Sequence, residues 1–221
     1  MEYSDRLHSE YLLYRIFQVI DRRSFRVRAV RITYLDRERD KTYTHPGFFI
    51  EHKRALAERV GGQILELPNI PLPDLDAGYS ANASLFAYFA GNTDFAFTSG
   101  PKGEDCCHNA VPVRLGASVV TVPYDFDATG FVNPPYAAPL PSLNLKFLTQ
   151  RLHRGYCLHR PQVAEAIERF RKAEPAIYTL INEHHALTHK RKKKLLSFSR
   201  GFYNVLNSSG KTNRRILETC R

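Results

Sequence analysis

Three groups of side chains that can bind metals or move protons lie within residues 91–130. They are Asp94, the adjacent pair His108 and Asn109, and the carboxylates Asp125 and Asp127. Two short apolar segments separate Asn109 from Asp125, which is typical of a β-hairpin. Residues that flank a hairpin lie together at its open end, so we expect these polar side chains to converge. Carboxylate and amide oxygens are ligands that Mg²⁺ prefers, and the stretch therefore predicts a nucleotide–metal site.

Some of these residues also have a simpler explanation. Asp94 lies in a loop, where solvated acids are common. Asp127 precedes a Thr-Gly turn, and an aspartate there can cap the turn instead of binding metal. Asp125 directly follows a strand-like apolar segment, so it is the stronger candidate for a metal ligand. The predicted metal ligands are Asn109, Asp125 and Asp127, and Asp94 is the predicted catalytic residue.

The composition predicts a folded and strongly basic protein. Hydrophobic residues make up 43% of the 221 residues, with 14 Phe and 12 Tyr, which is enough for a core. The net charge of +10 makes nucleic acid, phosphorylated ligands and anionic membranes candidate partners. No apolar run approaches the roughly 20 residues that span a bilayer. We therefore expect no membrane span and a cytoplasmic location.

The four cysteines do not follow a metal-binding pattern. Cys106 and Cys107 are adjacent, whereas structural zinc ligands are usually spaced by about two to four residues. Cys157 and Cys220 are isolated in the sequence. We expect all four to be reduced thiols.

Hydrophobic periodicity and the positions of glycines and prolines predict an α+β fold in two parts, residues 1–67 and 68–221, that meet at a proline-rich segment. In the first part we expect a helix over 5–20, antiparallel strands at 25–36 and 47–51, and a short helix over 53–60. In the second part we expect a helix over 80–90 capped by Ser80 or Asn82, hairpin strands at 110–113 and 118–122, and helices over 143–152, 163–172, 175–185, 190–206 and 212–220.

The order Gly-Asn-x-Asp at 91–94, His-Asn at 108–109 and Tyr-Asp-Phe-Asp at 124–127 resembles the catalytic core of atypical kinase-like proteins. HipA-type kinases and the spore-coat CotH-type kinases are similar in this respect. Wider segments, among them EYLLYRIF and VPYDFDATGFVNPPYA, look like a family of uncharacterised bacterial proteins with the same core. The resemblance implies a two-lobed kinase-like fold. Its N-terminal lobe would be reduced to a helix and antiparallel strands, and its C-terminal lobe would be mostly helical.

The resemblance also implies roles for single residues. In kinases an Asp orients the acceptor hydroxyl, while an Asn and the Asp after a hairpin hold the metal that bridges the nucleotide phosphates. Asp94 would thus be the catalytic base, Asn109 and Asp125 metal ligands, and ATP and Mg²⁺ the cofactors. Glu10, in the first helix, would be the ion-pair acid of the nucleotide site, and Glu51 is assigned to the same cofactor site. The acceptor, a protein or a small molecule, is unidentified.

The sequence departs from the kinase pattern at two places. The segment FAFTSGPKGEDCC separates Asp94 from His108, although these positions lie closer together in kinases. No glycine-rich phosphate loop or strand lysine precedes the first helix, and Arg28, Arg31 and Lys53 all lie downstream of it. A chain shortened at its N-terminus and a degenerate or inactive relative of the kinases both fit this pattern.

Two other functions compete with the kinase hypothesis. A DxD-type glycosyltransferase would use Asp125 and Asp127 to hold Mn²⁺ on a nucleotide sugar. A non-catalytic basic module would bind nucleic acid through residues 189–194 and the arginines of the first strand. The run HKRKKK has no interleaved aromatic residues for base stacking, and a solvated helix start also accounts for it.

Overall fold

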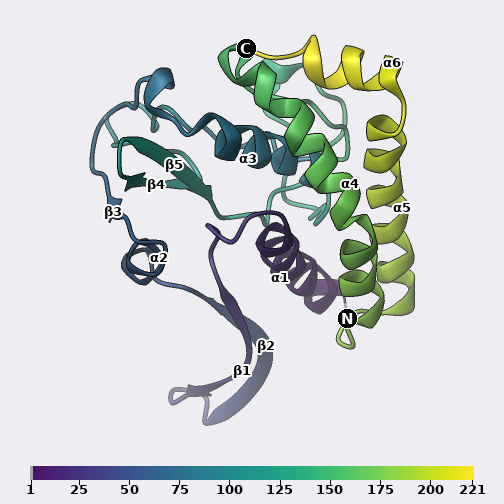
Figure 1. Cartoon of the computed structure of the whole chain (residues 1–221). Coiled ribbons are helices and arrows are strands. Elements are labelled where there is room, and N and C mark those ends of the chain that lie inside the picture. Colours follow the sequence, from purple (N-terminus) through teal and green to yellow (C-terminus); the bar gives the residue numbers. More distant parts are fainter. Residues whose placement is uncertain (1) are drawn as a thin grey trace.

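The computed structural model describes residues 2–221 and has an α+β architecture, which confirms the predicted class (Figure 1). The helices are α1 (Glu2–Ile20), α2 (Lys53–Arg59), α3 (Ala77–Ala90), α4 (Arg160–Glu183), α5 (His189–Leu206) and α6 (Ser209–Thr212). One antiparallel sheet pairs β1 (Val27–Asp36) with β2 (Lys41–Ile50), and a second has the order β3 (Gln63–Ile64), β4 (Ala110–Leu115) and β5 (Ser118–Pro123). Single turns of 3-10 helix lie at Leu72–Asp74, Pro141–Leu143 and Cys157–His159, and a π-helical turn lies at Asn213–Leu217.

Helix α3 lies at the centre of the hydrophobic core. Every residue from Tyr79 to the end of the helix is buried. A helix that is apolar on all sides must be covered on all sides, and α1, α4, α5 and β5 pack around it. Asp76 caps its N-terminus by accepting a hydrogen bond from the Tyr79 N–H at 2.7 Å. The predicted caps Ser80 and Asn82 are wrong, because both lie buried inside the helix.

Helix α1 brings the N-terminal part of the chain into this core. The Phe17 ring stacks on Phe86 of α3 with ring centroids 4.5 Å apart. Asp5 accepts hydrogen bonds from the backbone N–H and the hydroxyl of Thr188, the residue that caps α5. The buried side chains of both parts therefore form one continuous cluster. The division into domains at residues 67 and 68 stays a prediction.

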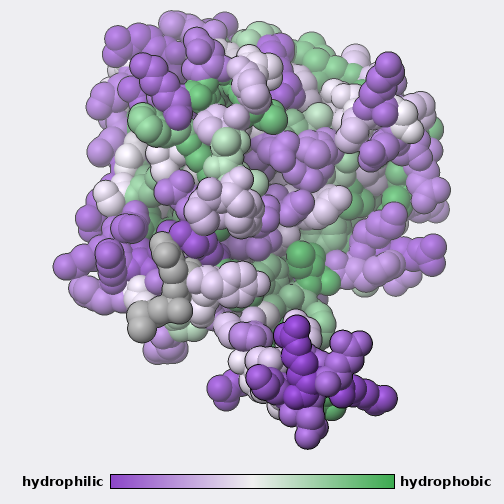
Figure 2. Space-filling view, turned by 180° about the vertical axis from the view of Figure 1, so that it is seen from behind, coloured by the Kyte–Doolittle hydropathy of each residue, from purple (hydrophilic) through white to green (hydrophobic). Residues whose placement is uncertain are grey.

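The β1–β2 hairpin projects away from the rest of the molecule (Figure 1). Its strands pair along their whole length, from Val27 opposite Ile50 to Asp36 opposite Lys41. Strand β2 is thus longer than the predicted strand at 47–51, because the register extends it back to Lys41. The projecting surface of the hairpin is mostly hydrophilic (Figure 2).

The predicted helices after residue 140 are only partly correct. The helix expected over 143–152 is absent, and a single 3-10 turn at Pro141–Leu143 stands before it. The helices expected over 163–172 and 175–185 are one helix, α4, which continues through Pro175 and buries one face. Tertiary packing of that face outweighs the local cost of the proline. The helix expected over 212–220 is replaced by α6 and the π-helical turn.

Disulfides bind all four cysteines, so the expectation of reduced thiols is wrong. Cys157–Cys220 ties the C-terminus to the segment before α4. Backbone hydrogen bonds reinforce this junction: the Cys157 N–H donates to Arg221 O at 3.0 Å, and the Arg221 N–H donates to Gly155 O at 2.8 Å. The adjacent pair Cys106–Cys107 forms the second disulfide.

Among residues 2–221, no helix has the length and apolar character needed to cross a membrane. The cytoplasmic location expected from the sequence stays a prediction.

The double variant Cys157→Ser/Cys220→Ser should lose about 4 kcal/mol of unfolding free energy, because the disulfide closes a long loop and so restricts the unfolded chain. Guanidinium unfolding of the oxidised proteins measures this loss. Reductant should then change the unfolding free energy of the double variant little. Its remaining disulfide joins the adjacent residues Cys106 and Cys107 and therefore encloses no loop. An unfolding midpoint equal to that of the parent protein would contradict the prediction.

Candidate active site

Asp94 is held by a folded loop at the end of α3. The Asn92 side chain accepts a hydrogen bond from the Asp94 N–H at 2.9 Å, an Asx turn that directs the chain away from the helix. Arg154 then donates to the carbonyl oxygens of Thr93 and Phe95, the two neighbours of Asp94. The guanidinium of Arg154 also lies over the Phe95 ring, 5.1 Å from its centroid. Asp94 is therefore fixed from both sides through its backbone.

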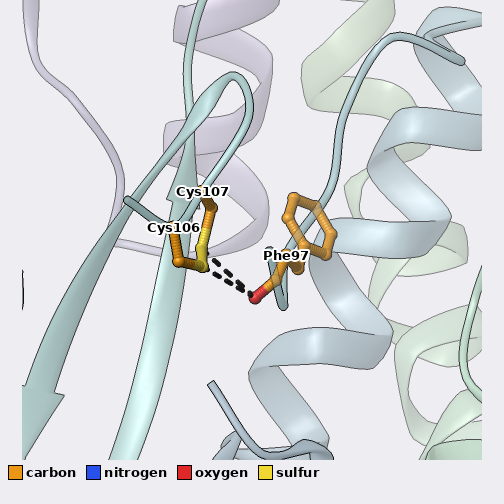
Figure 3. Close-up of a disulfide and its surroundings, with 3 residues drawn as sticks. All are labelled: Phe97, Cys106 and Cys107. Atoms are coloured by element: carbon orange, nitrogen blue, oxygen red, sulfur yellow. Dashed lines mark hydrogen bonds between the residues drawn. A yellow bond between two sulfur atoms is a disulfide. The ribbon is translucent and has the colours of Figure 1, made fainter. Parts of the chain in front are cut away.

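The segment between Asp94 and Asn109 is an ordered excursion that returns to its starting point. Ala96 and His108 form an antiparallel bridge, with both N–H···O distances at 3.1 Å. Inside the excursion Phe97 is buried, and its carbonyl oxygen lies 3.9 and 3.4 Å from the sulfur atoms of Cys106 and Cys107 (Figure 3). The long separation in sequence, which departs from the kinase pattern, is thus closed in space.

Asn109 and His108 both contact the Asp94 carboxylate or its backbone. Asn109 Nδ2 donates to Asp94 O at 2.8 Å and lies 3.4 Å from Asp94 Oδ2. His108 Nε2 lies 2.8 Å from Asp94 Oδ1. Within the described chain Asn109 Oδ1 has no hydrogen-bond partner, so this oxygen remains available to a cation.

Asp125 lies at the same open end of the β4–β5 hairpin, as the sequence predicts. Ala110 and Pro123 are the last paired residues, and the Tyr124 N–H donates to Asn109 O at 3.0 Å just beyond them. Asn109 and Asp125 both have left-handed backbones, with φ of 51° and 60°. Such residues cluster at functional sites, where the surrounding structure maintains the strain.

The left-handed turn at Asp125 has a specific support that sequence reasoning missed. The Asp125 N–H donates to the hydroxyl of Tyr14, which is buried in α1, at 2.9 Å. The next residue, Phe126, is also buried, and its ring packs against Tyr14 at 4.6 Å between centroids. The sequence pattern that predicts a helix over 5–20 gave no sign of the role of this hydroxyl.

Four carboxylates influence one another at this end of the molecule. Burial, followed by the charges of Asp127 and Asp125, raises the pKa of Glu10 to about 7, although the Phe126 N–H stabilises its ionised form. Burial also raises the pKa of Asp125, and the negative charges of Asp127 and Asp94 add to the shift. His108 opposes the shift at Asp125 only in part. A hard divalent cation with oxygen ligands would supply further positive charge.

Asp127 is already partnered on one side. Tyr136 donates its phenol proton to Asp127 Oδ2 at 2.8 Å, although the Tyr136 side chain is 70% exposed. Partial burial and the bond to Asp127 raise the pKa of Tyr136 to about 12. Sequence reasoning weighed Asp127 as a turn acid or a metal ligand and did not include Tyr136.

The two glutamates assigned to cofactor binding lie in different surroundings. Glu10 has Asp125 and Asp127 beside it, not a lysine. Glu51 binds Arg59, at 2.7 Å, and accepts from the Arg26 N–H, and these partners hold the pKa of Glu51 below its usual value. The structure therefore brings Glu10, but not Glu51, into electrostatic contact with the acids around Asp125.

A pocket of about 240 Å³ adjoins the open end of the hairpin. Its lining includes Lys53, Glu66, Ala110 and Tyr124. A larger hollow of about 770 Å³ lies between α4 and α6. The lining of neither pocket includes Asp94, Asp125 or Asp127. The described residues contain no group of three or more His, Cys, Asp or Glu side chains arranged to hold a metal ion by themselves. Any cation here would need oxygen ligands from Asn109 and a substrate as well.

No family model, curated protein or solved structure matches the chain. The function is therefore inferred from the geometry of this site.

Glu10→Gln should stabilise the metal-free protein above neutral pH. The unfolded chain loses the Glu10 proton near pH 4.5 and the folded chain near pH 7, so unfolding free energy falls as pH rises between these values. The total loss is about 3 kcal/mol at most, and it is fully present above pH 7. Urea unfolding from pH 4 to 8 in a chelator should show that the variant lacks this decline.

Glu51→Gln is the matched control for this experiment. Because Arg59 lowers the pKa of Glu51, its stabilisation is present above the unfolded pKa and is lost on acidification. Removing that carboxylate should destabilise the protein at neutral pH. Parallel pH profiles for the parent protein and Glu10→Gln would show that the Glu10 environment has been misassigned.

Proposed function

We propose that this protein is a kinase-like phosphotransferase that transfers the terminal phosphoryl group of ATP in the presence of Mg²⁺. The observation that carries the proposal is the contact between Asn109 and Asp94: the amide nitrogen binds the Asp94 backbone, and the amide oxygen is left for a cation next to Asp125. A base, an amide and a carboxylate at the end of a hairpin are the parts that phosphoryl transfer requires.

The charges at the site fit a nucleotide-bound cation. Mg²⁺ usually binds through one or two protein carboxylates and completes its shell with phosphate and water oxygens. Asn109 Oδ1 and the Asp125 carboxylate would hold it, and the free Asp127 oxygen would add a ligand or bind one of its waters. Bound Mg²⁺ would neutralise the phosphate charge and orient the phosphates for transfer.

The chain's own residues position the acceptor. Asp94 Oδ1 is engaged by His108, which leaves Oδ2, with only a long contact to Asn109, to receive the proton of an acceptor hydroxyl. Arg154 and Asn92 hold the Asp94 backbone, so the carboxylate has a fixed direction. Positioning and electrostatics of this kind account for most of the catalysis in phosphoryl transfer.

The proposal includes the two-lobed arrangement, with residues 1–67 as a reduced N-terminal lobe and 68–221 as the C-terminal lobe. Support comes from the 240 Å³ pocket, because its lining combines residues 53 and 64–66 of the first part with residues 105–107, 110–112 and Tyr124 of the second. Lys53 contributes a positive charge to this pocket. It is the candidate for the phosphate-binding lysine.

Asp125→Asn should weaken binding of Mg–ATP by about ten- to hundredfold, because a charged ligand is replaced by a neutral one of the same shape. Isothermal titration calorimetry measures the affinity. Asp94→Asn should keep the affinity but lower phosphate transfer by about 10²- to 10⁴-fold, as expected for loss of a general base. Asp36→Asn, at the tip of the projecting hairpin, is the control that should change neither quantity.

Equal Mg–ATP affinity in the parent protein and Asp125→Asn would overturn the proposal. Binding without transfer would identify a degenerate relative of the kinases. Thermal stabilisation by UDP-sugars with Mn²⁺, but not by ATP, would favour the DxD glycosyltransferase. Steeply salt-dependent nucleic-acid binding that survives loss of Asp94 and Asp125 would favour the basic module.

A further inference from the structure

The hydroxyl of Tyr136 reaches into the acidic site although its ring is outside. The side chain is 70% exposed, so packing does not explain its position. Its phenol group nevertheless donates to Asp127 Oδ2 at 2.8 Å. The same phenol lies within the electrostatic range of Asp125 and Glu10. The hydrogen bond to Asp127 therefore holds this exposed side chain in its position.

The backbone on both sides of Tyr136 is anchored. Arg191 of α5 donates to the carbonyl oxygens of Phe131 and Val132, at 2.9 and 2.6 Å. Downstream, Leu148 O packs so closely on Gly130 that a Cβ at that glycine would lie 2.6 Å away. The chain between these two anchors, residues 133–147, forms a loop, and Tyr136 lies in this loop.

Two prolines fix the direction in which the loop leaves its first anchor. Pro134 and Pro135 directly precede Tyr136, and proline restricts φ of its own residue and the conformation of the one before it. The two prolines thus restrict the backbone that presents the phenol to Asp127. A hydroxyl held against Asp127, at the proposed metal end of the site, lies where an acceptor hydroxyl would bind.

We propose that Tyr136 is a phosphate acceptor within this chain, and this inference rests on the proposed phosphotransferase function. Tyr136 Oη forms a bond to the terminal phosphorus of ATP, and the bond from that phosphorus to the bridging oxygen of ADP breaks. The phenol proton passes to the Asp127 carboxylate, which already accepts its hydrogen bond. ADP leaves with the bonding electron pair, so atoms and charge balance.

Phosphorylation would also move the loop. A phosphate carries close to two negative charges at neutral pH, and Asp127, Asp125 and Glu10 would repel it. The phosphorylated side chain would leave the carboxylates, and the site would open to a second acceptor.

The test is incubation of the purified full chain with ATP and MgCl₂, followed by mass spectrometry of the tryptic peptide 115–146. That peptide contains both Tyr124 and Tyr136, so fragment ions must locate the phosphoryl group. We expect phosphate on Tyr136, at an extent per molecule that does not depend on protein concentration. Tyr136→Phe should lose it, and Asp125→Asn should lower it by about tenfold or more.

Tyr34→Phe is the matched control, because Tyr34 is also exposed, at 52%, but lies on the projecting hairpin. It should leave the phosphate on Tyr136 unchanged. Trypsin should cleave after Lys146 faster in the phosphorylated protein than in a sample incubated without ATP. This readout detects the opening of the loop.

The outcomes separate the two proposals. Mg–ATP binding, or transfer to any other residue or added acceptor, without phosphate on Tyr136 overturns this inference alone. Equal phosphate on Tyr136 in the parent protein and Asp125→Asn also overturns it, because the phosphate would then come from another enzyme. Absence of Mg–ATP binding by calorimetry overturns the phosphotransferase function and this inference together.

Discussion

The site depends on one short antiparallel contact, the bridge between Ala96 and His108. This bridge returns the long excursion after Asp94 to its origin and places Asn109 where its amide binds the Asp94 backbone at 2.8 Å. From Asn109 the chain enters β4, and the β4–β5 register then fixes Asp125 at the same end. A shift of one residue in this pairing would turn the side chains to opposite faces and separate the polar groups.

Hydrophobic packing holds the elements next to the Ala96–His108 bridge in place. Helix α3, buried on all sides, ends in the loop that carries Asp94. Helix α1 crosses it and supplies Tyr14, whose buried hydroxyl receives the Asp125 N–H. The core thus positions Asp94 and Asp125, two acids from distant segments, through backbone hydrogen bonds. Support through the backbone suits a site whose charged side chains must face a substrate.

Two acids of the site, Glu10 and Asp125, are costly to ionise in the folded protein. Burial first, and then the charges of neighbouring carboxylates, raise the pKa values of Glu10 and Asp125. The left-handed backbones at Asn109 and Asp125 add local strain. Proteins retain such costs mainly where function requires them, because a neutral side chain would stabilise the fold. A bound divalent cation would offset these negative charges, which is the physical link between the acidic site and the proposed reaction.

Local patterns in the sequence determined the helices α1, α2, α3 and α5, the β4–β5 hairpin, and the convergence of Asn109 with Asp125, because hydrophobic period and strand pairing act over short distances. They did not determine five contacts: the hydrogen bond of Arg154 to the Thr93 carbonyl beside Asp94, the hydrogen bonds of the Tyr14 and Tyr136 hydroxyls, the Cys157–Cys220 disulfide, and the ion pair of Glu51 with Arg59. Except for the Glu51–Arg59 ion pair, each contact joins residues that are far apart in the sequence or that lie in irregular segments. Hydrophobic periodicity gives no signal for such contacts. Only tertiary packing decides which distant polar groups meet.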